Sequence, residues 1–395
     1  MIVRKVSSPE DGARINEIFA IAFEQKIPNC PYNPEEGLGH YWAAFNDDDE
    51  MTSSITVSDF DIRFDKHVCR MGGVGAVETL PQYRRGGGVR GCFNEALRYM
   101  YDNGYDFSYL YPFSTAYYRQ FGFECCVQKF GWEVNTALLP KFDTGCTFRL
   151  AENRNPMTDE IRAVDKVWEE RYNMMVQHDE KYYKWTLDPK PGEKQEFTYV
   201  CFDTEGKPNA YATFKCVYEA DGRNHVCSRF RFVDKLGFEV LMQLFKTMAA
   251  DHAYVKFETP CITSLQYMLP EWSLGATKWN IHFAGMVRAV NVKSVLEKAS
   301  YRGSGSAVIK IKDAQLSENN CCFEVKFAGG KAESVSVSES APDCVMEISK
   351  FSALISGVCD FDEALDGFGA VELINDNPAL RGIFYRKPLM ITDFF

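Results

Sequence analysis

The chain has 395 residues, of which 46% are hydrophobic and 25% charged, a composition typical of a folded globular protein. A single hydrophobic core rarely grows beyond about 250–300 residues, so we predict two or three domains. The formal net charge of −11 disfavours binding to nucleic-acid phosphates or to anionic membrane surfaces. We therefore expect no nucleic-acid or membrane partner, and the charge suits a cationic one.

Fourteen cysteines are spread along the chain without the spacing of a disulfide framework. There is no C-x-x-C pair, and no second ligand pair follows His67 and Cys69 at zinc-finger spacing, so we predict no metal site. No stretch approaches the roughly 18 uninterrupted apolar residues of a membrane span. We expect buried thiols in a reducing compartment and a cytoplasmic protein.

The first 150 residues predict a mixed α/β unit. Ser8 suits the N-cap of a first helix with Pro9 in its first turn, and Gly104 suits the end of a later one. The predicted elements are a strand over 1–6, a helix over 7–23, strands over 51–80, a helix over 88–104, a strand over 107–113, and a short helix with a strand over 114–126.

Two further α/β patterns follow. The second has helices over 157–175 and 181–188, a strand meander over 196–233, a helix over 237–252 and a strand over 253–260. The third begins after 279–290, with a helix over 292–300, strands over 306–313, 321–330 and 333–338, and helices over 348–357 and 360–367.

A glycine-rich loop, R-R-G-G-G-V-R-G over 84–91, joins a strand pattern to a helical one. Gly86, Gly88 and Gly91 form a G-x-G-x-x-G, the fingerprint of dinucleotide-binding folds. In that fold the first glycine ends the strand and an acidic residue closes the next strand. Here five residues separate the strand from Gly86, and Asp106 opens the next strand instead of closing it. The pattern disfavours a dinucleotide site.

The same stretch reads V-x-T-x-P-x-x-R-R-x-G and resembles motif A of the GNAT acetyltransferase superfamily. The resemblance implies that backbone amides at a helix N-terminus hold the diphosphate of acetyl-CoA. Glycine lets the backbone approach the phosphates, and two arginines add positive charge. The usual final small residue is replaced by Val89. The implied cofactor-binding residues are Val77, Thr79, Arg84, Arg85, Gly86, Gly87 and Gly88.

A second segment, A-Y-Y-R-Q-F-G-F over 116–123, resembles the A-x-x-Y-x-x-x-G-F element of the same superfamily. The resemblance places Tyr118 beside the departing thiolate, where a phenol can protonate the sulfur. Tyr117 is the neighbour that competes for this role. The implied reaction is direct transfer without a covalent enzyme intermediate, so Cys92 and Cys125 are interpreted as packing residues.

One GNAT unit, a degenerate second unit and a third domain together resemble the Eis (enhanced intracellular survival) family, whose third domain is like a sterol carrier protein. The resemblance implies an α/β (α+β) fold with tandem GNAT-like mixed sheets and a final α+β domain. We expect the acetyl-CoA loop in a GNAT domain over 1–150, a degenerate GNAT-like domain over 151–284, and a sterol-carrier-like domain over 285–395.

The chain ends in I-T-D-F-F. In Eis-like enzymes a terminal carboxylate on a final phenylalanine acts as general base toward the amine, which implies this role for Phe395. Such enzymes acetylate cationic amines such as aminoglycosides, so we expect a primary amine of an aminoglycoside or polyamine as acceptor. They also form hexamers, which implies a homo-oligomer here. Candidate substrate-binding residues are Phe23, Glu24, Trp42 and Asp393. Some relatives have an acidic pocket residue where this chain has Gln25, which leaves aminoglycoside selectivity open.

Two other functions stay open at this point. The protein could be an inert GNAT and sterol-carrier-like binding protein for an apolar ligand, or an acyltransferase that acts on peptide lysines. The intact Arg84–Gly88 loop and Tyr118 favour an active acetyltransferase.

Overall fold

The computed structural model of the chain describes residues 1–27, 39–220, 222–260, 267, 269, 276–367 and 369–394. These residues form two compact units. The first consists of Met1–Val127, Ala284–Lys387 and Thr392–Phe395, and the second of Gln128–Phe283 and Pro388–Ile391. Their strands form three separate sheets, and the predicted mixed α/β class is confirmed.

The first unit begins with a seven-stranded mixed sheet. Its strands are, in spatial order, β1 (Ile2–Val6), β2 (Gly39–Phe45), β3 (Met51–Phe64), β4 (His67–Thr79), β5 (Phe107–Leu110), β14 (Met286–Ala289) and β6 (Glu124–Cys125). β4 and β5 are parallel, and the other neighbouring pairs are antiparallel. A helix joins β4 to β5, as a parallel connection requires.

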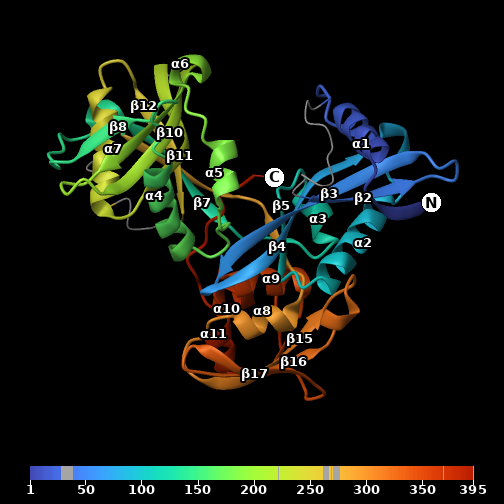
Figure 1. Ribbon diagram of the computed structural model, residues 1–395. Helices are drawn as coiled ribbons and strands as arrows, with labels where there is room; N and C mark the ends of the chain where they lie inside the picture. Colours follow the sequence, from blue (N-terminus) through green and yellow to red (C-terminus); the bar gives the residue numbers. More distant parts are fainter. Residues whose placement is uncertain are drawn as a thin grey trace. The chain divides into compact units, whose positions relative to one another are not determined.

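Helices α1 (Pro9–Ala22) and α2 (Gly88–Asp102) cover opposite faces of this sheet (Figure 1). The alternation along β2 produces the two faces, because successive side chains of a strand point to opposite sides. Trp42 and Ala44 pack in the core under α2, whereas Ala43 and Phe45 pack in the core under α1. The predicted cap of α1 is confirmed, since Ser8 Oγ accepts a hydrogen bond from the Asp11 amide at 3.0 Å.

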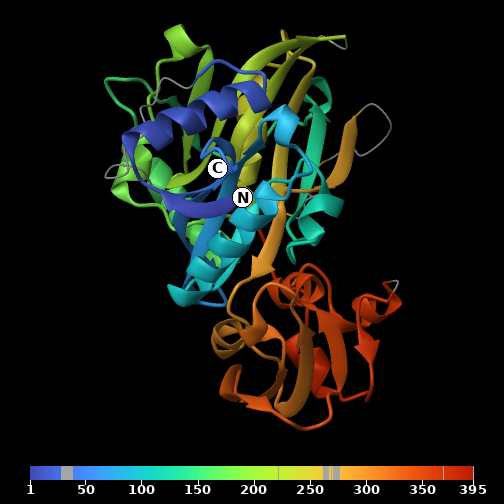
Figure 2. The same ribbon diagram turned by 90° about the vertical axis from the view of Figure 1, so that its right-hand side faces the viewer.

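The remaining part of the first unit, orange to red in Figure 2, is a five-stranded sheet with helices packed against it. Its strands are β17 (Lys331–Ser338), β16 (Cys322–Ala328), β15 (Gly305–Lys312), β18 (Cys344–Glu347) and β19 (Glu372–Leu373). Its helices are α8 (Val292–Lys298), α9 (Ile348–Ser356), α10 (Phe361–Asp366) and α11 (Ala379–Ile383).

Three lysines of this C-terminal part pair with buried carboxylates of the first sheet region. Lys298 contacts Asp106 at 2.7 Å, and Lys350 contacts Glu124 at 2.5 Å. Lys387 is itself buried and pairs with Asp65. Separating the C-terminal part from the first sheet would break these pairs and leave buried charges uncompensated. The pairs therefore hold the two parts together.

The second unit has its own seven-stranded sheet and core. Its strands are β13 (Thr277–Phe283), β7 (Gln128–Asn135), β12 (Tyr254–Pro260), β11 (Gly222–Phe232), β10 (Pro208–Glu219), β9 (Glu196–Phe202) and β8 (Thr147–Leu150). Its helices are α4 (Thr158–Arg171), α5 (Glu180–Thr186), α6 (Pro191–Lys194) and α7 (Lys235–Thr247).

The strand pairing bears on the expected domain borders. β7 pairs within the second sheet although it precedes residue 150, and β14 completes the first sheet although it follows residue 285. The division at 150 and 285 stays a prediction. No helix in the described ranges combines the length and apolar character needed to cross a membrane.

Candidate functional site

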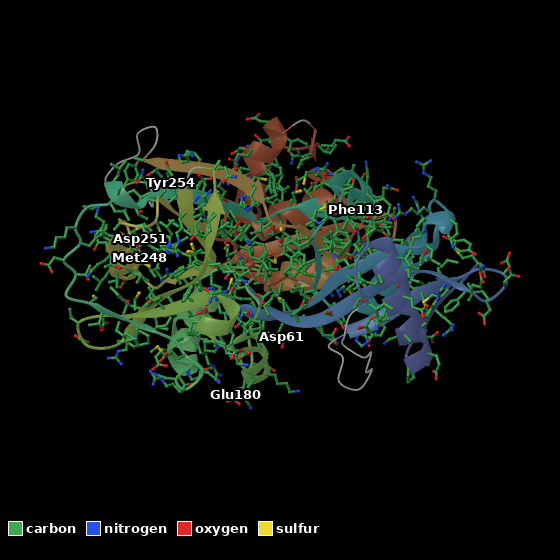
Figure 3. All side chains as sticks on the ribbon, turned by 90° about the horizontal axis from the view of Figure 1, so that it is seen from above. Asp61, Phe113, Glu180, Met248, Asp251 and Tyr254 are labelled. Carbon is green, nitrogen blue, oxygen red and sulfur yellow. The ribbon has the colours of Figure 1, made fainter. Side chains whose placement is uncertain are left out.

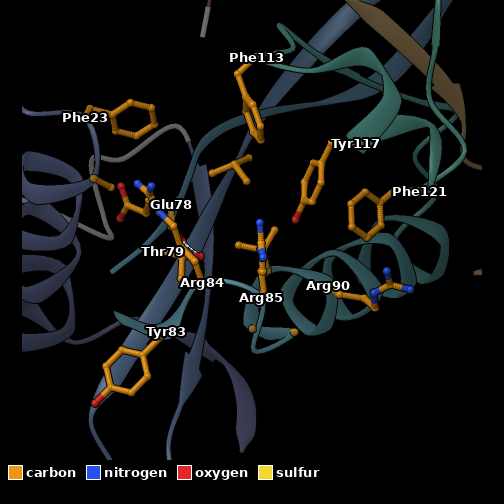
Figure 4. A pocket seen from close by; sticks show the side chains of 15 residues that line it. Phe23, Glu78, Thr79, Tyr83, Arg84, Arg85, Arg90, Phe113, Tyr117 and Phe121 are labelled. Atoms are coloured by element: carbon orange, nitrogen blue, oxygen red, sulfur yellow. Dashed lines mark hydrogen bonds between the residues drawn. The ribbon is translucent and has the colours of Figure 1, made fainter. Parts of the chain in front are cut away.

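A pocket of about 560 Å³ opens in the first unit where β4 ends (Figure 4). The end of β4, the turn before α2, the end of α1 and the segment after β5 all contribute to its wall. The lining residues are Ala22, Phe23, Val77, Glu78, Thr79, Tyr83, Arg84, Arg85, Gly87, Gly88, Val89, Arg90, Phe113, Tyr117 and Phe121.

The turn before α2 presents free backbone donors to this pocket. Gly87 is the N-cap of α2 and has φ +85°, a left-handed conformation that glycine adopts without a Cβ clash. In the described part of the chain, the amides of residues 87–90 donate no hydrogen bond. Free amides at the positive end of a helix dipole form an anion site, and a diphosphate fits this chemistry.

Arg84 and Arg85 flank the same turn and line the pocket. Both side chains are exposed, and neither guanidinium has a hydrogen-bond or ion-pair partner among the described residues. Arg85 has φ +69°, which costs a non-glycine residue roughly 1–2 kcal/mol. Gly86 does not line the pocket, and its amide donates to the Tyr83 carbonyl at 3.2 Å. The positive charge of this turn is available to a ligand.

Gly88 is required by close packing of α2 on the sheet. A Cβ added there would lie 2.5 Å from Ser53 Oγ and 3.2 Å from Ala44 Cβ. The two consecutive glycines therefore have different roles. Gly87 sets the turn, and Gly88 lets the helix N-terminus approach β2 and β3.

We expect Gly88→Ala to destabilise the fold by about 1–3 kcal/mol, because overpacking forces neighbouring atoms apart. It should also weaken binding of CoA, since the helix N-terminus is displaced. Thermal unfolding and calorimetric titration with CoA measure both effects. Gly192→Ala in α6 is the control, because no atom lies within 4 Å of its added Cβ. Equal stability and CoA affinity in the Gly88 variant would contradict this packing role.

β4 has a bulge against β3 near its C-terminal end. Ala76 has φ +42°, and the register with β3 shifts so that Ser54 faces Glu78 while Thr56 faces Gly75. Pairing between β4 and β5 ends at Val74. Beyond it, among the described strands, none lies opposite the β5-facing edge of residues 75–79. Val77 and Thr79 line the pocket on this stretch, so main-chain groups there are open to an extended ligand.

Tyr118 lies in α3 (Thr115–Arg119) next to Tyr117, and of the two only Tyr117 lines the pocket. Tyr118 is 2% exposed, its hydroxyl has no hydrogen-bond partner in the described part of the chain, and its oxygen is not fully enclosed. Burial, with a smaller contribution from Tyr117, raises the pKa of Tyr118, so the phenol stays protonated at neutral pH. Figure 4 shows Tyr117 and Arg85 turned into the same space.

Arg288 of β14 holds the segment that follows α3. Arg288, fully buried, donates to the Phe121 carbonyl at 2.8 Å and pairs with Asp313 at 2.7 Å. Gly122 has φ +79°, and a Cβ there would lie 1.8 Å from Arg288 Nη1. The glycine after Tyr118 is therefore required both by its backbone conformation and by the buried guanidinium beside it.

The end of the chain lies against the segment after β5. Tyr111 Oη donates to the Asp393 carbonyl at 2.5 Å, and the Tyr111 and Phe394 rings are 4.6 Å apart. Phe113, which is labelled in Figure 3, comes two residues later and lines the pocket. Asp393 does not line it, and Phe395 lies outside the described residues.

The other predicted substrate residues are dispersed. Phe23 is the C-cap residue of α1, is 42% exposed and lines the pocket. Glu24 is exposed and does not line it. Trp42 is 3% exposed and packs against Tyr99 in the core under α2, away from the lining. The pocket thus contains one of these three residues.

Sequence reasoning missed Glu78, which lies between the two predicted residues Val77 and Thr79. Its side chain is 2% exposed, and Ser54 Oγ donates to its Oε1 at 2.5 Å. Burial raises the pKa of Glu78 to about 8, while the hydrogen bond from Ser54 lowers it. The only available signal was an acidic residue within an otherwise apolar strand end. No group of three or more potential metal ligands occurs in the described ranges.

Two segments of the sequence match known domain families, and the first of them contains the pocket. Residues 3–126 match the acetyltransferase (GNAT) domain family, and residues 292–383 match the sterol carrier protein domain family. No curated protein matches the sequence.

Solved structures share the fold over the whole chain. A conserved protein of Enterococcus faecalis V583, described as a probable N-acyltransferase, has a TM-score of 0.85 at 18% identity, covering 100% of this chain and 99% of its own. A GCN5-related N-acetyltransferase from Anabaena variabilis has 0.83 at 18%, with 100% of both chains covered. Eis1 from Mycobacterium abscessus has 0.80 at 15%, also with 100% of both chains covered.

Residues 3–126 form an acetyltransferase (GNAT) domain, and all the lining residues of the pocket lie within this range. A sterol carrier protein domain follows, and the fold is shared with Eis1 from end to end. Its architecture is therefore Eis-like, and the predicted resemblance is confirmed.

Proposed function

We propose that the protein transfers the acetyl group of acetyl-CoA directly to a primary amine of a cationic acceptor of the aminoglycoside or polyamine type. The observation that carries the proposal is the pocket turn, where free amides of residues 87–90 stand beside the unpaired guanidiniums of Arg84 and Arg85. These groups would hold the CoA diphosphate, and Gly86 would contribute through the shape of the turn.

The chain's own residues have distinct tasks in this reaction. Main-chain groups of Val77 and Thr79, beyond the point where β5 pairing ends, would hold the pantetheine arm and stabilise negative charge on the thioester oxygen. Tyr118 would give its proton to the leaving sulfur. A carboxylate would take the proton of the amine, and the resemblance assigns this role to the terminal carboxylate of Phe395.

Thiol release from acetyl-CoA, measured with a panel of aminoglycosides and polyamines, tests the proposal. We expect amine-dependent release and a product acetylated on nitrogen by mass spectrometry. No release with any amine, together with binding of a fatty acyl probe, would favour the carrier function that the sterol carrier protein domain makes possible. Release only with lysine-containing peptides would instead assign a peptide acceptor.

If the terminal carboxylate is the base, as the resemblance implies, extension of the chain by three residues after Phe395 lowers kcat/KM for the amine at least about 100-fold, because that carboxylate is moved. Folding and CoA affinity should be unchanged, and thermal unfolding and calorimetry measure them. As a control, the same three residues are added before Met1. An extended chain with normal turnover would remove the terminal carboxylate from the mechanism.

We also propose a cytoplasmic location and a homo-oligomer, a hexamer by resemblance to Eis-like enzymes, without nucleic-acid or membrane partners and without a metal. Light scattering on the purified protein measures the oligomeric state.

A further inference from the structure

Glu78 carries a carboxyl oxygen without a partner. In the described part of the chain, Oε2 is fully enclosed and makes no hydrogen bond, while Oε1 accepts one from Ser54. Buried polar atoms are almost always paired, because an unpaired one loses its hydration without compensation. An enclosed, unpaired carboxyl oxygen in the wall of a ligand pocket therefore indicates a group that the ligand supplies.

Because side chains alternate along β4, the Glu78 carboxyl points to the opposite face of the sheet from Val77 and Thr79. Thr79 Oγ1 donates to Ser53 Oγ at 3.0 Å, next to Gly88 on the α2 side. Glu78 and its partner Ser54 therefore point to the α1 side. Figure 4 shows the Glu78 carboxyl on the side of the pocket where Phe23 lies. One ligand bound at the turn before α2 and a second ligand bound near the end of α1 would both contact the end of β4.

Within the part of the chain that the structure describes, the Glu78 carboxyl has no charged partner. The titratable groups that line the same pocket are Tyr83, Arg84 and Arg85 before α2, Arg90 in α2 and Tyr117 in α3; β3 contributes the neutral Ser54. None of them forms an ion pair with Glu78 among the described residues. Burial without a cation raises its pKa to about 8. A base whose pKa lies near the working pH is the most effective proton acceptor.

We propose that Glu78, in place of the terminal carboxylate of Phe395, receives the acceptor's primary ammonium group at Oε2 and accepts its proton before the nitrogen attacks the thioester. This inference rests on the proposed acetyl transfer. One ammonium proton moves to Glu78, and the freed lone pair forms the N–C bond as the C–S bond breaks. Tyr118 gives its proton to the sulfur and regains one from the acylated nitrogen through solvent. Glu78 then releases its proton to solvent, and atoms and charge balance.

The test compares Glu78→Gln with the wild type, using spermidine and neomycin as probes. We expect kcat/KM for either amine to fall about 100-fold at pH 7.5, with the Kd for acetyl-CoA unchanged. In the wild type kcat/KM should rise with pH to a plateau above about 8, at the same pH for both amines, because Glu78 must lose its proton. The variant should lack this rise. Glu95→Gln on the exposed face of α2 is the matched control.

Ser54→Ala gives a second measurement. The Ser54 hydrogen bond lowers the pKa of Glu78, so its loss should move the rise in kcat/KM to higher pH without removing it. A terminal carboxylate acting as the sole base has an ordinary pKa near 3.5 and would leave both variants with the wild-type profile.

The pH dependence of the melting temperature tests the raised pKa of Glu78 independently of catalysis. Glu78 is protonated in both states below the unfolded value of 4.5. As pH rises from there to about 8, the unfolded chain ionises this carboxyl while the folded protein keeps it protonated, so the folded protein loses stability. We expect the wild-type melting temperature to fall relative to Glu78→Gln between pH 5 and pH 9. A constant difference would overturn the inference, as would wild-type kcat/KM in Glu78→Gln. Failure of the proposed function looks different, since then the wild type releases no thiol with either amine.

Discussion

Replacing Tyr118 by phenylalanine should lower kcat about 100- to 1000-fold while the KM for acetyl-CoA changes less than about threefold. The expected loss follows from the leaving group, because a thiolate expelled without a proton donor recaptures the carbonyl carbon more often. Burial raises the pKa of Tyr118 and keeps its proton in place over the working pH range. Steady-state kinetics of thiol release measure both constants.

Tyr117→Phe is the matched control, since it removes the same hydroxyl from the next residue of α3. Tyr117 lines the pocket and Tyr118 does not, so its variant should raise the KM for a substrate more than it lowers kcat. A larger fall in kcat for Tyr117→Phe than for Tyr118→Phe would transfer the proton-donor role to Tyr117. Wild-type kcat in both variants would remove the phenol from the mechanism.

The glycine-rich turn before α2 was predictable because its sequence signals are local. Glycines, two arginines and a following helical pattern are contiguous in sequence, and the structure places Arg84, Arg85, Gly87 and Gly88 together at the pocket. The strand before the helix and the cap at Ser8 follow the same short-range rules. A motif of this kind needs no knowledge of distant partners.

The rest depended on partners far apart in sequence. β2 was not predicted. Trp42 lies on this strand and was named as a candidate substrate-binding residue, but it packs in the core under α2. β14 joins the first sheet only after a long excursion of the chain. Glu78 gave no signal of its own, because an unpaired oxygen becomes visible only when the atoms that could have paired with it are placed.

Replacing both Arg84 and Arg85 by alanine should raise the Kd for acetyl-CoA about 100-fold or more, since each charged hydrogen bond to a phosphate contributes roughly 1.5–3 kcal/mol. Each single variant should raise it about 10-fold or more, and kcat at saturating acetyl-CoA should change little. Calorimetric titration measures the affinity. Because the charges are exposed, the wild-type Kd should also rise with ionic strength, and the double variant should lose most of that dependence.

Two comparisons separate charge from backbone effects in this prediction. Arg14→Ala removes an exposed arginine of α1 that pairs with Glu17, so it should leave the affinity unchanged. Arg85→Gly removes the same charge as Arg85→Ala but relieves the φ of +69°, and it should be the more stable of the two by about 1 kcal/mol at equally weak CoA binding. If the double variant bound acetyl-CoA as tightly as the wild type, the diphosphate would have to lie elsewhere, and the free amides of residues 87–90 would lose their assigned ligand.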